Sequence, residues 1–163
     1  MIETATFDSF DGQPIADHSL GRGRPTLMIH GFLADTDLDG FKPGIAAAAA
    51  GLGRRIIAPD LRGHGASGAP TDVADWPSDV LALDQQALIA HLRLTDYDPI
   101  GYPLGDRTAV RLMVRGARPG KAVLGGMGDT GIMEAGAGRP CSKTPSATAR
   151  RPPTPGSPGR TRP

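Results

Sequence analysis

The sequence predicts an α/β fold, a mostly parallel β-sheet with helices on both of its faces. Over residues 1–128, short apolar or β-branched runs alternate with segments whose apolar residues recur at helical spacing. Two of these runs are apolar without interruption, which is typical of strands buried on both faces of a parallel sheet. Beyond residue 128 the alternation stops. We therefore expect a folded domain over residues 1–128 and a disordered tail over residues 129–163.

A hairpin opens the predicted sheet. Residues 4–10 hold β-branched and aromatic side chains and predict the first strand. Asp11-Gly12 is a strong turn signal, so residues 13–19 are expected to return antiparallel. The apolar run Thr26–Ile29 then predicts a buried central strand over residues 25–32.

A helix and a second buried strand follow. Residues 38–52 predict a helix that ends at Gly53, although Pro43 and Gly44 could delay its start. The run Ile56-Ile57-Ala58 predicts a strand over residues 55–61. This order of strand, helix and strand is expected to place the two strands parallel in one sheet.

The second half of the predicted domain repeats the alternation. Residues 76–94 predict a helix in which Val80, Leu83, Ala87 and His91 recur at helical spacing. Three leucines lie beside them, Leu81, Leu88 and Leu92. After this helix we expect a short strand that ends near Tyr102, a helix over residues 106–115 and a last strand over residues 121–124.

Charge and composition argue against several classes of function. The net charge of +1 gives no general attraction to nucleic acid or to an anionic membrane. The longest apolar stretch, residues 46–50, is too short to cross a membrane, and residues 1–4 lack the basic region of a secretory signal. The single cysteine, Cys141, excludes an intramolecular disulfide and fits a reducing compartment. We expect a cytoplasmic protein without nucleic-acid or membrane partners.

The last segment differs in composition from the rest. Residues 134–163 contain no Val, Ile, Leu, Met, Phe, Trp or Tyr. Such a segment cannot bury enough apolar area to offset an ordering cost of about 1–2 kcal/mol per residue. Two interpretations stay open for it. It is either the product of out-of-frame translation of a GC-rich gene, which truncates the fold, or a natural flexible extension.

Three motifs follow successive predicted strands, and together they resemble one family. They are His30-Gly31-Phe32, the run Asp60-Leu61-Arg62-Gly63-His64-Gly65-Ala66-Ser67, and Gly101-Tyr102-Pro103-Leu104-Gly105. Over about residues 20–128 they resemble the N-terminal half of the α/β-hydrolase fold family. The resemblance implies an incomplete α/β-hydrolase-type sheet, because the full fold with its late catalytic histidine needs more than 163 residues.

The resemblance also implies roles for these motif residues. His30 and Gly31 shape a loop in which the backbone N–H of Phe32 is one oxyanion-hole donor, and the N–H of Leu104 is the second. Gly63 and Gly65 permit a tight loop. The polar side chains that can cross-link this loop are Asp60, Arg62, His64 and Ser67. His64 is therefore interpreted as a loop residue and not as a general base.

The third motif departs from the family pattern. Gly101 and Gly105 match the glycines of a Gly-x-Ser-x-Gly nucleophile elbow, but Pro103 stands at the serine position. Proline has no nucleophilic atom and fixes φ at about −65°, whereas the resemblance implies a positive φ for the nucleophile. No histidine follows the elbow, because His91 is the last one in the chain. We assign no catalytic residue and expect catalysis to be impaired.

Other candidates for chemistry have simpler interpretations. Asp106 opens a predicted helix, where the helix dipole favours a carboxylate. Asp129 follows the last predicted strand, where some members of the family keep the acid of the triad. The spacing of His and Cys predicts no metal site, and Gly125–Gly128 lacks the spacing of a dinucleotide fingerprint. We expect no cofactor.

Three functional hypotheses follow. The first, by resemblance, is an esterase-like hydrolase of ester or related bonds that is catalytically impaired. The second is a non-catalytic scaffold that binds a small apolar, ester-like ligand in a pocket under Phe32 and Leu104. The third is a product without a function of its own, whose last strand leaves an unpaired sheet edge through which copies associate.

Overall fold

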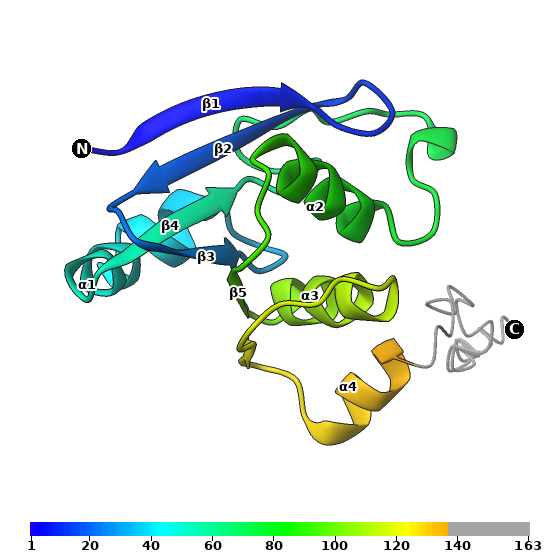
Figure 1. Cartoon of the computed structure of the whole chain (residues 1–163). Coiled ribbons are helices and arrows are strands. Elements are labelled where there is room, and N and C mark those ends of the chain that lie inside the picture. Colours follow the sequence, from blue (N-terminus) through cyan, green and yellow to red (C-terminus); the bar gives the residue numbers. More distant parts are fainter. Residues whose placement is uncertain (137–163) are drawn as a thin grey trace, which may run out of the picture.

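The structure is a computed structural model that describes residues 1–136, and these residues form a six-stranded mixed sheet (Figure 1). The sheet has the order β1-β2-β4-β3-β5-β6, in which β4, β3, β5 and β6 are parallel to one another. The strands are β1 (Glu3–Asp8), β2 (Pro14–Leu20), β3 (Arg24–Ile29), β4 (Arg54–Pro59), β5 (Asp98–Gly101) and β6 (Val123–Leu124). The predicted α/β class with a mostly parallel sheet is confirmed. The disorder predicted for residues 137–163 lies outside the described residues.

The first two strands form the predicted hairpin. Phe7 of β1 faces Ile15 of β2 across the antiparallel pair. In the turn, Gly12 has a φ of +82° and donates its N–H to the Ser9 carbonyl (3.0 Å). Glycine adopts this left-handed conformation without the steric cost of a Cβ. β2 then pairs antiparallel with β4, which joins the hairpin to the parallel strands.

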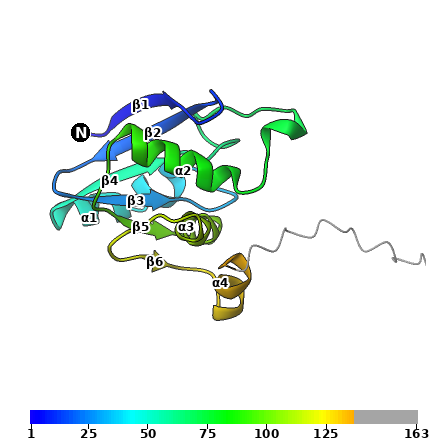
Figure 2. The ribbon, with the colours of Figure 1, turned by 45° about the vertical axis from the view of Figure 1, so that its right-hand side comes forward.

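Helices cover both faces of the sheet, as predicted. They are η1 (Asp37–Phe41, a π-helical turn), α1 (Ile45–Gly51), η2 (Val73–Asp75, a 3₁₀ turn), α2 (Val80–His91), α3 (Leu104–Val114) and α4 (Asp129–Gly136). In Figure 2, α2 and α3 lie in front of the sheet and α1 lies behind it. The sheet is therefore the middle of three layers.

Two apolar cores, one on each face, hold these layers together. Successive residues of a strand point to opposite faces, and β3 shows the consequence. Ile29 is buried in the core that contains Leu112 of α3, whereas its neighbour Met28 is buried in the core that contains Ala46 of α1. Burial of one large aliphatic side chain contributes about 1.5–3 kcal/mol. The uninterrupted apolar run in β3 thus serves both faces.

The helix predicted over residues 38–52 is divided into η1 and α1. Pro43 and Gly44 separate the two pieces, and Gly44 has a φ of +81°. Proline has no N–H for the hydrogen-bond ladder, and a left-handed residue cannot continue a right-handed helix. The regular helix therefore starts only at Ile45, the delayed start that these two residues suggested.

The helix α2 starts later than predicted and buries only some of the residues that the sequence indicated. It begins at Val80 because Asp79, with a φ of +64°, is left-handed. Of the residues at helical spacing, Val80 is buried and His91 is exposed, and Leu88, which was expected beside them, is fully buried. Asp84 and Leu88 are fully buried and mark the face toward the sheet. A buried acidic residue obscured the apolar stripe in the sequence.

The last described elements also differ from the prediction. β6 has only two residues, Val123 and Leu124, where the sequence predicted a strand over residues 121–124. Residues 129–136 were predicted to belong to the tail, but they form α4, which packs beside α3. The folded part of the chain therefore reaches at least Gly136.

Candidate functional site

The three motifs meet at the carboxyl ends of the parallel strands. β3 ends directly before His30, β4 ends directly before Asp60, and β5 ends with Gly101. Since these strands are parallel neighbours, their carboxyl ends lie along one edge of the sheet. In open α/β sheets, ligands bind in the crevice outside this edge. The topology thus gathers the predicted site residues where a ligand would bind.

His30 is buried at the end of β3 and links two loops. Its Nε2 accepts a hydrogen bond from the Leu61 N–H (2.8 Å), and its Nδ1 lies 2.7 Å from the Gly31 carbonyl oxygen. Because Nε2 is an acceptor, Nδ1 carries the proton and donates it to Gly31. Burial lowers the pKa of His30, which favours the neutral ring. Both nitrogens of this histidine are thus engaged with the backbone.

Asp60 and Ser67 fasten the loop after β4. Asp60 accepts hydrogen bonds from the N–H groups of Thr36 (3.0 Å) and Ala66 (2.9 Å). Ser67 donates its hydroxyl to the Asp60 carbonyl oxygen (2.6 Å). A Cβ on Gly65 would lie 2.2 Å from Asp60 Oδ2, so the loop requires glycine there. Burial opposes the ionisation of Asp60, but the hydrogen bonds outweigh it and lower its pKa.

Arg62 forms a buried ionic network that reaches far beyond its own loop. Its Nε and one terminal nitrogen donate to Asp84 of α2 (3.0 and 2.7 Å), and both terminal nitrogens donate to Asp11 of the hairpin (2.6 and 2.8 Å). Asp84 also accepts a hydrogen bond from the Ser9 hydroxyl (2.5 Å). The sequence predicted that Arg62 cross-links a loop, but its carboxylate partners were missed.

His64 bridges two loops at this edge. Its Nδ1 lies 3.0 Å from the Arg62 carbonyl oxygen, and its Nε2 lies 2.7 Å from the Phe32 carbonyl oxygen. The His64 ring stands edge-on to the His30 ring, with centroids 5.1 Å apart. These contacts attach the loop after β4 to the loop after β3, in line with the interpretation of His64 as a loop residue.

Pro103 occupies the turn between β5 and α3. β5 ends at Gly101 and α3 begins at Leu104, with Pro103 directly before its first residue. Pro103 has a φ of −72° and a ψ of −24°, an ordinary right-handed helical conformation. The resemblance implies a positive φ for a nucleophile at this position. The turn is therefore present but has the relaxed backbone that proline requires.

The glycines of this turn allow β3, β5 and α3 to approach closely. A Cβ on Gly105 would lie 2.0 Å from the Ile29 carbonyl oxygen, and one on Gly101 would lie 2.3 Å from the Gly105 carbonyl carbon. A Cβ on Gly31 would lie 3.1 Å from Cδ of Pro103. The structure therefore brings the His-Gly loop directly against the proline turn.

The two predicted oxyanion-hole residues occupy different surroundings. The Phe32 side chain is exposed to 66%, whereas the Leu104 side chain packs against the core under α2 and α3. Leu104 is the first residue of α3, and N–H groups in the first turn of a helix have no acceptor within the helix. The pocket predicted under these two side chains is not where the structure places its apolar cavity.

Asp106 anchors the loop after β6 to the first turn of α3. It is fully buried, and its Oδ1 accepts a hydrogen bond from the Gly125 N–H (2.8 Å). Its Oδ2 has no partner among the described residues. Burial raises the pKa of Asp106, although hydrogen bonds from Gly125 and Met127 act in the opposite direction. The predicted placement at the helix start is correct, and the link to Gly125 was missed.

An apolar cavity of about 520 Å³ opens beside the proline turn. This volume is in the range of small-molecule sites. Its floor is the sheet face on which α1 packs, and η1 and the start of α1 form its wall. The lining residues are Met28, Ile29, His30, Leu38, Asp39, Pro43, Ile45, Ile100, Gly101, Tyr102, Val123 and Gly125. Of the predicted site residues, His30 and Gly101 line it and Phe32 and Leu104 do not.

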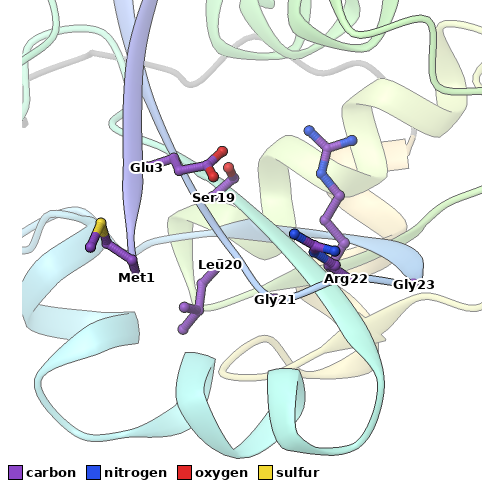
Figure 3. A pocket seen from close by; sticks show the side chains of 8 residues that line it. Met1, Glu3, Ser19, Leu20, Gly21, Arg22 and Gly23 are labelled. Atoms are coloured by element: carbon purple, nitrogen blue, oxygen red, sulfur yellow. The ribbon is translucent and has the colours of Figure 1, made fainter.

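A second hollow, of about 500 Å³, lies at the opposite end of the parallel strands (Figure 3). Figure 3 shows Glu3 and Ser19 on the neighbouring strands β1 and β2, close to the turn that carries Arg22. None of the three motifs contributes to its lining. We therefore place the candidate site at the carboxyl edge.

The described residues contain neither a metal-binding cluster nor a membrane-spanning helix. Within residues 1–136, no group of three or more His, Cys, Asp or Glu side chains is placed to hold a metal ion. Over the same residues, no helix combines the length and apolar character needed to cross a bilayer.

Asp129 is exposed at the start of α4, where its carboxylate accepts a hydrogen bond from the Thr130 N–H (2.7 Å).

Comparisons with known proteins agree with this geometry. The α/β hydrolase fold family matches residues 25–112, more than half of the chain. The non-heme haloperoxidase of Rhodococcus erythropolis is 35% identical over 117 residues, which are 70% of this chain and 40% of that protein. The AB hydrolase superfamily protein YisY of Bacillus subtilis is 32% identical over 107 residues, 64% of this chain and 38% of that protein.

Solved structures show the same arrangement. An epoxide hydrolase variant of Vigna radiata superimposes with a TM-score of 0.68 at 25% identity, over 76% of this chain and 38% of that chain. An esterase of Exiguobacterium antarcticum gives a TM-score of 0.66 at 25% identity, over 74% of this chain and 44% of that chain. The chain thus spans about two fifths of the length of these relatives. The chain belongs to the α/β-hydrolase fold family.

Proposed function

We propose that this chain is an esterase-like member of the α/β-hydrolase family whose nucleophilic catalysis is disabled. One observation carries the proposal: Pro103 occupies the strand-to-helix turn in a helical backbone conformation, with no atom that could attack a substrate. Loss of a nucleophile lowers turnover by a factor of about 10⁶ in a serine hydrolase.

Labelling with a fluorophosphonate tests this proposal. The unaltered chain and a Pro103→Ala control are expected to remain unmodified at residues 101–105 by mass spectrometry of tryptic peptides. A Pro103→Ser variant restores a hydroxyl at the nucleophile position and is the matched comparison. Covalent modification of the unaltered chain at this turn would contradict the proposal.

A second candidate function is the binding of a small apolar, ester-like ligand without chemistry. The cavity beside Tyr102 favours it, because its lining is largely apolar and its volume suits a small molecule. Filling the cavity with Val123→Trp is expected to abolish the chemical-shift changes that a small neutral ligand causes at Gly101 and Gly125. Val73→Trp, at an exposed residue outside the cavity, serves as the matched control. Equal binding by both variants would remove this candidate.

A third candidate is a product without an independent function that associates through its sheet edge. β6 is the last strand in the sheet order, and its outer side has no partner strand among the described residues. An unpaired edge can add the edge of a second copy. Light scattering over a range of concentrations tests this candidate, and a monomer at the highest concentration would count against it.

A further inference from the structure

The charge in the apolar cavity indicates which ligand the cavity would take. Asp39 is the one acidic residue of its lining, and the lining contains no Lys or Arg among the described residues. His30, the remaining titratable group besides Tyr102, is buried and its pKa is lowered, so its ring adds no compensating positive charge. An apolar cavity with one uncompensated carboxylate attracts a cation more strongly than a neutral molecule.

The Asp39 side chain is held at the cavity by the backbone. Its Oδ2 accepts a hydrogen bond from the Gly31 N–H (2.7 Å), and its own N–H donates to the Asp35 carbonyl (3.1 Å). Its neighbour Asp37, on the same π-helical turn, pairs with Lys42 (2.8 Å). Within residues 1–136, no Lys, Arg or His forms an ion pair with Asp39. The carboxylate is therefore fixed in position and uncompensated.

An aromatic residue also lines the cavity. Tyr102 lines the cavity with a side chain exposed to 59%. A Cβ on Gly31 would lie 3.0 Å from the Tyr102 backbone carbonyl oxygen and 3.2 Å from Asp39 Oδ2. The Tyr102 ring itself lies beside Gly125 and Gly126, where an added Cβ would be 3.3 and 2.9 Å from ring carbons. Ile100 and Val123 provide an apolar floor beside it.

We infer that this cavity binds a small apolar molecule that carries an ammonium group, with the ammonium at Asp39 and the apolar body against Ile100 and Val123. The inference rests on the proposed ligand-binding function of the cavity. A neutral ester-like molecule would fill the same volume but would leave the Asp39 charge uncompensated. Charge complementarity therefore selects the amine over the neutral ligand.

Titration with benzylamine and with benzyl alcohol tests the inference, because the two probes match in size and differ in charge at neutral pH. Binding is followed by amide chemical shifts at Gly31, Gly101 and Gly125. The amine is expected to bind about tenfold or more tightly than the alcohol. Asp39→Asn, which keeps an oxygen to accept the Gly31 N–H, is expected to remove this difference. Asp37→Asn, on the same turn but outside the lining, is the control and is expected to keep it.

A salt titration on the unaltered chain gives a second measurement that needs no variant. Rising ionic strength is expected to weaken the binding of benzylamine and to leave benzyl alcohol unaffected. If both probes bind equally, the inference is wrong and the ligand-binding proposal stands. If neither probe shifts the cavity amides, both fail. If light scattering shows that the chain dimerises and neither probe shifts the cavity amides of the dimer, the inference is overturned as well.

Discussion

At the scale of single residues, Arg62 carries a fully buried charge. Its side chain is fully buried, and it donates to the carboxylates of Asp84 and Asp11 and to the Asp75 carbonyl. Removal of one partner from a buried ion pair leaves the other charge without compensation. We predict that Arg62→Met lowers the free energy of unfolding by about 3–5 kcal/mol, as measured by urea denaturation.

Two further variants separate charge from packing at this position. Arg118→Met replaces an exposed arginine and is expected to change stability by less than about 0.5 kcal/mol. The double variant Arg62→Met with Asp84→Leu removes both buried charges together and is expected to be less destabilised than Arg62→Met alone. If the double variant is less stable than Arg62→Met, then the unpaired charge of Asp84 is not what destabilises the single variant.

Single residues also show where prediction from sequence stops. The motif around Asp60 and Arg62 was evident, because its glycines and polar residues are contiguous. The partners of Arg62 are 51 and 22 positions away, and no local pattern connects them. Asp39 lies within a segment predicted as regular helix, and its contact with Gly31 depends on how η1 packs at the end of β3. Contacts that depend on how distant elements pack cannot be predicted from the spacing of residues along the sequence.

At the scale of elements, alanine substitutions at the two ends of α1 are expected to change the free energy of unfolding in opposite directions. The two positions are Gly44 and Gly51. Gly44 precedes the helix with a φ of +81°, and a Cβ there would meet no atom within 4 Å. Its replacement is therefore penalised by backbone conformation alone, and Gly44→Ala is expected to cost about 1–2 kcal/mol. Gly51 is helical and equally open, so Gly51→Ala is expected to add about 0.5–1 kcal/mol.

Thermal unfolding of the two alanine variants measures this difference directly. The melting temperature is expected to fall for Gly44→Ala and to rise for Gly51→Ala. Each variant is the matched control for the other, because both add one methyl group to the same short element in open space. A shift of the same sign in the melting temperature of both variants would show that the positive φ of Gly44 does not determine the cost of replacing it.

The elements that the sequence located well are those with a strong local signal. The hairpin, β3, β4 and α3 follow from turn residues, apolar runs and helical spacing within each segment. The burial of Asp84 in α2 was not predicted, because its carboxylate faces Arg62 from a position where an apolar residue was expected. β6 is short because it pairs with β5 only at Ile100 and Gly101. Contacts with distant parts of the chain thus determine both the burial of Asp84 and the length of β6.

At the scale of the whole molecule, the two ends of the parallel strands hold different groups of residues. The carboxyl end holds the candidate site, and the amino end holds an ionic network around Asp98. Asp98 accepts hydrogen bonds from Arg24 (2.8 and 2.9 Å), from Arg54 and from the Lys121 N–H (2.8 Å). The network connects β3, β4 and β5 to the segment before β6. This network therefore lies at the end of the sheet opposite the candidate site.

The Arg24 hydrogen bonds hold the pKa of Asp98 well below its usual range. Because the pKa is lower in the folded chain than in the unfolded chain, ionised Asp98 stabilises the fold at neutral pH. This contribution is lost progressively as the pH falls below about 4 and the carboxylate is protonated. The stability of the chain is therefore expected to decline on the acid side.

We predict that Asp98→Asn lowers the free energy of unfolding at pH 7 by about 1–3 kcal/mol, and by less at pH 3. Urea denaturation at the two pH values measures the difference. Asp96→Asn is the control, since Asp96 is largely exposed and bonds only to Arg24 among the described residues. Ligand titration at the cavity is expected to be unchanged in Asp98→Asn, because the network lies at the other end of the strands. An equal loss of stability at both pH values would show that packing, and not ionisation, explains the role of Asp98.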